Sequence, residues 1–330
     1  MTEGVHGVRR QQEPPALWRN HDYVLLLTGQ TASKIGSGMS MFAFPLVTLS
    51  LTHSLLLAGA CGSLYVTGSA AASLPAGWHV DRYDRKRIMV AAMLCGGLLF
   101  ASLVVADWLG HLGTAQLLLA ATLAGVVAAY YSPAELAAVH KIVTTTQLPS
   151  AMAANQARQM VSNLVAGPAG GLLLAAGRTL PFAVDAASYL VAVITTTRVR
   201  SFLGPEPAGE AQATWSAVRA GLEWLWRRRE LRLIVLAATA LNFAAAGLLL
   251  AVTLILRREG VGYAQIGLLE SAAATAGFAG AAAASLEVLE APAVPEFSRA
   301  VNFPGFDGFT SESIACFTIA GAQPAFIAFF

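Results

Sequence analysis

Long stretches without charge dominate this sequence. No Asp, Glu, Lys or Arg occurs from Ile35 to Val80, and none occurs from Ile88 to Ala106. A surface helix of a soluble protein carries charge on its water-facing side, whereas a helix that crosses a bilayer needs about 20 apolar residues. Only 12% of the residues are charged, against roughly a quarter in globular domains. The sequence therefore predicts an all-α, polytopic membrane protein.

A cluster of charge separates these two stretches, over residues 77–87. It ends in three consecutive cations, Arg85, Lys86 and Arg87, and cations beside membrane spans stay on the cytoplasmic side. We therefore expect a short cytoplasmic loop here, and a cytoplasmic N-terminus, in a multi-pass protein of the plasma (inner) membrane. The net charge of +2 does not indicate a nucleic-acid partner, because the cations lie in loops where they set topology.

Turn residues and charges divide the rest of the chain into further spans. After a tail over residues 1–21, a first transmembrane half is expected within residues 22–198, with spans at about 23–51, 55–76, 88–106, 114–138, 153–176 and 180–197. Residues 199–230 are expected to be a cytoplasmic linker with an amphipathic helix on the membrane surface. Spans at about 231–256 and 266–284 form part of a second half, over residues 231–285. This order predicts two tandem halves.

The charged cluster resembles a known family. Five of its residues are similar to the pattern Gly-x-x-x-Asp-Arg-x-Gly-Arg-(Arg/Lys), which lies between the second and third helices of major facilitator superfamily transporters: Gly77, Asp81, Arg82, Arg85 and Lys86. Asp84 stands where the family usually has Gly. The spacing alone also fits a generic basic loop. In the family this aspartate pairs with the loop arginine and with a helix end of the opposite half, so the resemblance implies a conformational latch.

Further segments resemble bacterial exporters of the enterobactin-exporter and macrolide-efflux type, in the same chain order. They are Asp22 with Gln30, Ser33 and Gly36; Ser132-Pro133-Ala134 with Leu148-Pro149 and Ala153-Ala154-Asn155; Asp185-Ala186-Ala187-Ser188-Tyr189; and Gly221-Leu222 with Leu225-Trp226. The resemblance implies alternating access, in which two halves rock around a midplane site. It further implies proton-coupled export of a small amphiphilic molecule such as a drug, a macrolide or a siderophore-like compound. Substrate, protons and the lipid bilayer are then the expected partners, with no obligate protein partner.

The composition changes towards the C-terminus. No Leu occurs from Ala291 onward, where eight of the 15 Phe and four of the 14 Pro are found. We therefore expect residues 286–330 to be an atypical Phe- and Pro-rich tail, with the family pattern truncated or altered after about residue 285. The alternative function is a non-transporting membrane protein, either a truncated remnant or a sensor or assembly partner.

No pattern for enzymatic chemistry occurs in the sequence. It contains no Gly-x-x-x-x-Gly-Lys-Ser/Thr for phosphate binding, and its six His and three Cys are scattered without metal-ligand spacing. We expect no enzyme activity, no cofactor and no metal.

Polar residues within the spans are the candidates for a transport pathway, because charge in a bilayer is costly. Gln30, Lys34 and Ser37 share one face of a helix, as the lining of a central cavity would. Lys34 is expected either to contact substrate or pair with a carboxylate, or else to snorkel or be structurally paired.

Two carboxylates are candidates for carrying the proton. Asp185 lies at the outer start of the sixth span, where the helix dipole alone would also favour it, and Glu270 lies in the eighth span. Glu135 and Arg158 lie near the cytoplasmic ends of their spans, and an ion pair or an interfacial position explains them without a role in transport.

The fifth span contains Gly167, Pro168, Gly170 and Gly171. This segment is similar to the Gly-Pro-x-x-Gly-Gly signature of facilitator-superfamily antiporters, one residue shorter, which favours an exporter. Small residues allow close helix contact and Pro allows a bend. The segment therefore serves either as a hinge or as ordinary tight packing.

Overall fold

The computed structural model describes residues 17–201, 203–204, 223–224, 226–273 and 275. A short 3-10 helix η1 (Leu17–Arg19) precedes α1 (His21–Thr52), α2 (Leu55–Arg82), α3 (Arg85–Trp108), α4 (Thr114–Ile142), α5 (Leu148–Ala176), α6 (Leu180–Arg198) and α8 (Arg229–Arg258). Residues 263–273 are also helical. Within this described part, α1 to α6 are each long and apolar enough to cross a membrane. The predicted all-α polytopic fold is confirmed.

Four of the expected segments fall largely outside the described residues. They are the N-terminal tail, most of the amphipathic segment of the linker, the second part of the expected span over residues 266–284, and the Phe- and Pro-rich tail after residue 285.

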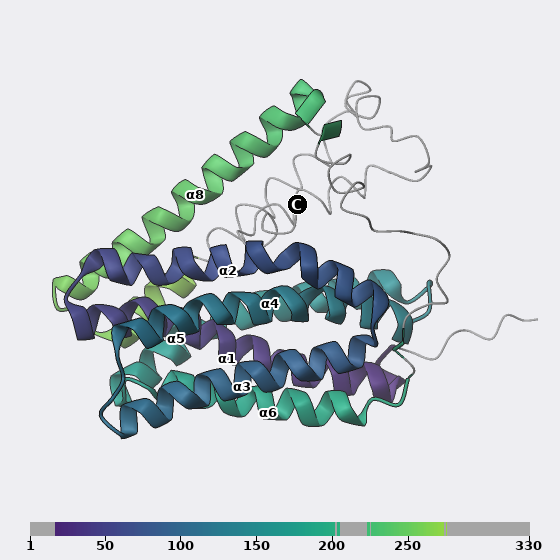
Figure 1. Cartoon of the computed structure of the whole chain (residues 1–330), viewed down its shortest axis with the longest axis horizontal. Coiled ribbons are helices and arrows are strands. Elements are labelled where there is room, and N and C mark those ends of the chain that lie inside the picture. The colour runs from purple at the N-terminus through teal and green to yellow at the C-terminus, as the bar shows by residue number, and fades with distance from the viewer. Residues whose placement is uncertain (1–16, 202, 205–222, 225, 274, 276–330) are drawn as a thin grey trace, which may run out of the picture.

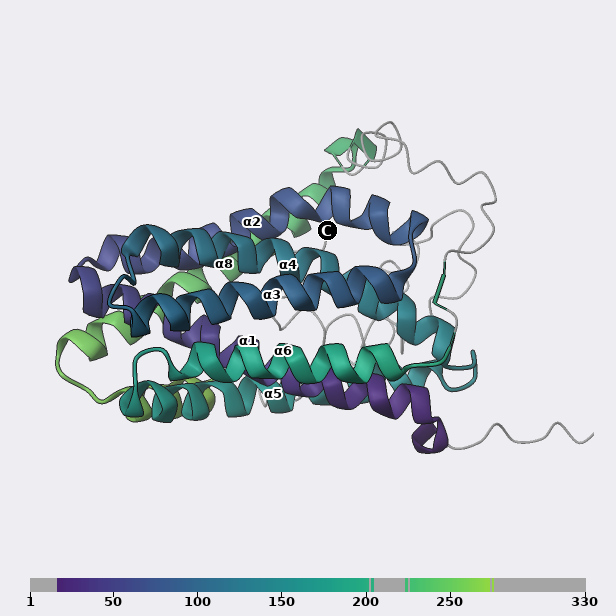
Figure 2. The same ribbon diagram turned by 60° about the horizontal axis from the view of Figure 1, so that its bottom comes forward.

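The six helices run up and down in one bundle (Figure 1). α2 packs against α4, α3 packs against α4 and α6, and α1 contacts α2, α4, α5 and α6. Figure 2 shows the same arrangement from another side, with α2 and α4 next to each other. α1 is therefore the central helix, and its polar residues Gln30, Ser33, Ser40 and Thr48 are buried against other helices. α8 is set at an angle to the bundle (Figure 1).

Glycines bring α2 and α4 into backbone contact. A Cβ atom at Gly68 would overlap the Thr122 carbonyl oxygen on α4, and a Cβ atom at Gly125 would overlap the Tyr65 carbonyl oxygen on α2. Between helices in a membrane, association depends on such close approach of small residues, since lipid is as apolar as the side chains.

The expected loop over residues 77–87 is much shorter than predicted. α2 continues through Pro75 and Gly77 to Arg82, and only Tyr83 and Asp84 separate it from α3. Pro does not end the helix here, because helices in a membrane tolerate Pro within them. Asp84 then starts α3 as its N-cap, and its Oδ1 accepts a hydrogen bond from the Lys86 backbone N–H at 2.9 Å.

Two more helices extend beyond their predicted ends, which were at about residues 138 and 153. α4 passes through Pro133 to Ile142, and α5 begins at Leu148, with Pro149 in its first turn. Pro fits the first turn of a helix because the missing N–H has no intrahelical partner there.

The segment that follows α6 is fastened to the bundle at the end where α1 begins. Asp22 accepts hydrogen bonds from the backbone N–H groups of Arg200 and Ser201, at 3.1 and 2.7 Å. Lys86 Nζ donates to the carbonyl oxygens of Thr197 and Val199, at 2.9 and 2.8 Å. These bonds tie the ends of α1, α3 and α6 together.

Candidate functional site

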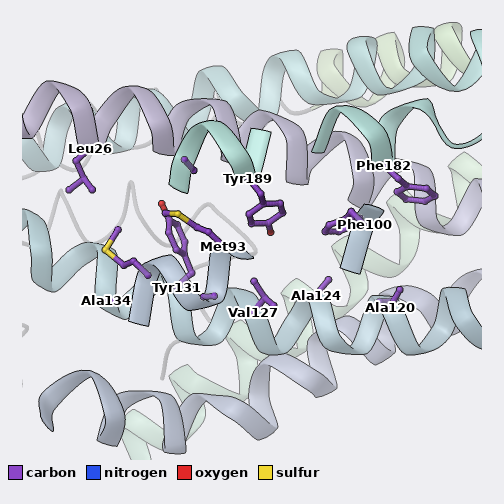
Figure 3. Close-up of a cluster of buried hydrophobic side chains, with 14 of the residues drawn as sticks. Leu26, Met93, Phe100, Ala120, Ala124, Val127, Tyr131, Ala134, Phe182 and Tyr189 are labelled. Carbon is purple, nitrogen blue, oxygen red and sulfur yellow. The ribbon is translucent and has the colours of Figure 1, made fainter. Parts of the chain in front are cut away.

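A small cavity of about 60 Å³ lies among α1, α2, α3, α4 and α6. Its lining combines one charged side chain, several hydroxyls and an apolar remainder. The lining residues are Ser33, Lys34, Ser37, Met41, Tyr65, Phe100, Ala124, Val127, Ala128, Tyr131, Ser132 and Tyr189. Figure 3 shows part of this lining, with Ala124, Val127 and Tyr131 on α4 and Phe100 and Tyr189 opposite them.

Lys34 reaches the cavity from α1. It is half-buried, and within the described part of the chain its ammonium has no hydrogen bond and no salt bridge. The predicted face of α1 is present only in part. Lys34 and Ser37 line the cavity, whereas Gln30 points elsewhere and is 2% exposed.

Gln30 instead belongs to a polar network around Arg158 of α5. Arg158 Nη1 donates to Gln30 Oε1 at 2.9 Å, and Nη2 donates to Glu135 Oε1 and to Asn155 Oδ1. The side chains of Arg158 and Glu135 are only 5% and 6% exposed, so this is a buried ion pair. Of the two explanations for Glu135 and Arg158, an ion pair or an interfacial position, the structure shows the ion pair, and its network joins α1, α4 and α5.

Asp185 of α6 is fully buried. Its Oδ1 lies 3.3 Å from Ser37 Oγ on α1 and 3.3 Å from Ser188 Oγ, while its Oδ2 has no hydrogen-bond partner within the described residues. Ser37 Oγ also lies 3.2 Å from the Tyr189 hydroxyl. Asp185 is the sixth residue of α6, beyond the first turn, where the helix dipole acts. Its hydroxyl partners, not the helix N-terminus, hold it in place.

Close packing of α1 on α6 makes this arrangement possible. A Cβ atom at Gly36 would lie 2.8 Å from Asp185 Oδ1, and one at Gly96 of α3 would lie 2.8 Å from the Tyr189 ring. Without side chains at these positions, Asp185 lies against α1 and Tyr189 against α3. The structure thus connects Asp185 to the cavity through Ser37 and Tyr189, which are both lining residues.

Glu270 lies apart from this site. It is in the helical residues 263–273, and its Oε1 accepts a hydrogen bond from Thr253 Oγ1 of α8 at 2.7 Å. The structure does not bring it together with Lys34 or Asp185.

The glycines of α5 form contacts on two sides. A Cβ atom at Gly167 would lie 2.8 Å from the Gly267 carbonyl oxygen, and one at Gly171 would overlap the Tyr263 carbonyl oxygen. Gly170 faces α1, and a Cβ atom there would lie 3.2 Å from the Phe42 ring. α5 continues through Pro168 as one helix. In this structure the segment packs α5 tightly against its neighbouring helices.

The residues of the charged segment 77–87 form different contacts. Asp81 is exposed and forms no hydrogen bond or salt bridge with any described residue. The Arg82 guanidinium stacks over the Trp78 ring at 4.3 Å, and Lys86 caps the end of α6. The backbone N–H of Arg85 donates to the Leu203 carbonyl oxygen at 3.3 Å. The implied pair of Asp81 with a loop arginine is therefore not formed in this state.

The comparison with known families agrees with this architecture. The family profile described as Major Facilitator Superfamily matches residues 26–293. The chain belongs to this superfamily of transporters. It is thus a multi-pass membrane protein of a transporter family.

Similar curated proteins are multidrug efflux pumps. The Multidrug efflux pump Tap of Mycobacterium tuberculosis is 28% identical over 234 residues, which cover 66% of this chain and 54% of the pump. The pump of the same name from Mycolicibacterium fortuitum is 26% identical over 235 residues, which cover 66% of this chain and 56% of that protein. The chain spans about half the length of these curated relatives.

The sequence did not identify several residues of the site. Tyr65, Tyr131 and Tyr189 line the cavity, and Arg158 organises the network beside it. A buried Arg in a membrane helix is a signal of function, but the helix ends were expected too far inward, which placed Arg158 at the interface. No local pattern distinguishes a cavity-lining Tyr from one that faces lipid.

Proposed function

We propose that this chain is a secondary active exporter of a small amphiphilic molecule, which works by alternating access and couples export to proton entry. Membership of the Major Facilitator Superfamily supports transport, and the drug pumps among its relatives support the outward direction. The proposal places it in the plasma (inner) membrane, with the N-terminus in the cytoplasm and residues 199–230 linking the two halves.

The environment of Asp185 is the observation that supports the proposed coupling of export to proton entry. Its carboxylate is fully buried and contacts hydroxyls, not a cation, within the described residues. An ionisable group inside a membrane bundle without a counter-charge is functional by default. Gain or loss of one proton at Asp185 changes the charge beside Ser37, and through Ser37 the polarity of the cavity. Proton transfer can thereby favour one direction of opening.

The exposed Asp81 supports a second element of the mechanism. Because its carboxylate has no partner among the described residues, it is free to meet one in another state. A carboxylate is stabilised by a guanidinium or by a helix N-terminus. We propose that Gly77, Asp81, Arg82, Arg85 and Lys86 form a latch that closes one state.

Dye accumulation in bacteria without their own drug pumps tests this function. We expect cells that express the 330-residue chain to accumulate less of a fluorescent amphiphilic dye than cells with an empty vector. A protonophore should abolish the difference. Asp185→Asn should abolish it by removing the proton carrier, and Asp81→Asn should reduce it by removing the latch. Asp84→Asn is the matched control, because Asn caps a helix as well as Asp does.

Two outcomes would contradict the proposal. If Asp185→Asn retains full efflux, the coupling does not depend on this carboxylate. If the chain reaches the membrane but changes the accumulation of none of a set of dyes, a non-transporting membrane protein becomes the better interpretation.

A further inference from the structure

Lys34 is the only cationic group that lines the cavity within the described part of the chain, and no anionic group faces it there. The remaining lining residues carry hydroxyls or are apolar. In a low-dielectric bundle an unpaired ammonium is costly. A cavity with this lining attracts a negative charge.

The nearby carboxylates are engaged elsewhere. Glu135 is close enough to act electrostatically on Lys34, but it forms a buried ion pair with Arg158. The charges of Arg158 and Glu135 neutralise each other, so the positive charge of Lys34 is not compensated. Asp185 does not line the cavity, and its Oδ1 is held by Ser37 and Ser188.

The hydroxyls of the cavity add hydrogen-bond donors around this cation. Tyr131 is 7% exposed, and its Oη forms no hydrogen bond of normal geometry with a described residue, although the Gln30 side chain is near. Figure 3 shows Tyr131 projecting from α4 into the space between the helices, with Tyr189 projecting into it from the opposite side. Ser33 and Ser132 contribute further lining hydroxyls. A carboxylate only accepts hydrogen bonds, and an ammonium with several hydroxyls supplies the donors that it needs.

The rest of the lining is apolar. Phe100 of α3, Met41 of α1 and Val127 of α4 all face the cavity. Phe100 also stacks on Tyr189, with ring centroids 5.9 Å apart. The cavity of about 60 Å³ has room for the charged group of a ligand, and an aromatic body attached to it, which needs a cavity of roughly 150 Å³ or more, would lie against these apolar side chains when the helices move apart.

We infer that the cavity selects amphiphiles that carry a carboxylate on an apolar body, and that Lys34 binds the carboxylate. This inference rests on the proposed function for the movement of the ligand, but not for its binding. It assigns the substrate class as anionic amphiphiles rather than organic cations.

Equilibrium binding with three ligands of matched size tests this assignment. The full chain is purified into phosphatidylcholine nanodiscs, and binding to empty nanodiscs is subtracted. The ligands are 2-naphthoate (anionic), 2-naphthalenemethanol (neutral) and 2-naphthylmethylamine (cationic). We expect 2-naphthoate to bind tighter than the alcohol by about 10-fold or more, as for a hydrogen bond to a charged group. The amine should bind most weakly.

Two substitutions of Lys34 then separate the effect of its positive charge from the effect of the cavity shape. Lys34→Gln should remove the preference for 2-naphthoate while the alcohol still binds, which shows that the cavity is intact. Lys34→Arg should keep a preference for the anion. Arg87→Gln is the control for net charge, because the Arg87 side chain is 88% exposed and far from the cavity lining.

The outcomes separate this inference from the proposed function. Equal binding of the three ligands, or an unchanged preference in Lys34→Gln, overturns the inference even if dye efflux is observed. Binding of 2-naphthoate through Lys34 without any efflux supports the inference and contradicts the exporter.

Discussion

Arg158 shows how a single residue organises the interior of this bundle. A guanidinium presents its donors in a fixed fork, and here they reach acceptors on three helices: Gln30, Glu135 and Asn155. Buried charges are tolerated only when they are paired and hydrogen-bonded. Removal of one partner leaves the other as an uncompensated charge.

Glu135→Ala should therefore destabilise the protein strongly, by about 3–5 kcal/mol, because Arg158 would keep a buried, unpaired charge. The measurement is the apparent melting temperature of the detergent-purified protein, followed by tryptophan fluorescence. The control is Arg178→Ala, which breaks the half-exposed pair of Arg178 with Asp107. Such a pair contributes about 0–1 kcal/mol. Equal melting temperatures of the two variants would show that the buried pair does not stabilise the bundle.

At the scale of helices, small residues decide which elements pair. Gly68 and Gly125 let the backbones of α2 and α4 touch, and Gly36 of α1 leaves room for the Asp185 side chain of α6. The glycines of α5 pack against the residues around Gly267 on one side and against α1 on the other. These contacts position the helices whose side chains line the cavity.

Gly68→Val should lower the melting temperature and the yield of folded protein, because its Cβ atom would overlap a backbone carbonyl that cannot move aside. Gly62→Val is the matched control on the same helix, since a Cβ atom at Gly62 has no neighbour within 4 Å. The change in helix propensity is the same at both positions, so it cancels in the comparison. An equal loss of stability in both variants would exclude the α2–α4 contact as the cause.

For the whole molecule, the described helices alternate in direction, so their turns lie at two opposite ends of the bundle (Figure 1). The turns at His53 and His111 lie at one end, and the turn at Thr145 lies at the other, with the start of α1. Cations gather at this second end, among them Arg85, Lys86 and Lys141. From the positive-inside rule we propose that this end lies in the cytoplasm.

Thiol labelling of intact cells checks this orientation. The native Cys61, Cys95 and Cys316 are replaced by Ala, and single cysteines are introduced as His53→Cys, His111→Cys or Thr145→Cys, all at exposed positions. A membrane-impermeant maleimide should label the first two directly, and Thr145→Cys only after permeabilisation. The reverse pattern would place the N-terminus outside the cell.

Local information in the sequence determined the membrane class, the family and the approximate spans of α1 to α6. Charge-free runs and the turns between them are local features, and they predict spans without knowledge of packing. Helix ends were less predictable, because Pro75 would terminate a helix in water but is accommodated within α2 in this bundle.

Tertiary structure alone decided which polar residues meet. Gln30 and Arg158 are 128 residues apart in the chain, and Ser37 and Asp185 are 148 apart. The sequence selected Lys34 and Asp185 as candidates because charge inside a span is rare and costly. It did not show that Gln30 binds Arg158, or that Asp185 reaches the cavity through Ser37. Those contacts depend on how closely α1 approaches α5 and α6, which is set by the packing of glycines against neighbouring helices and not by any local pattern.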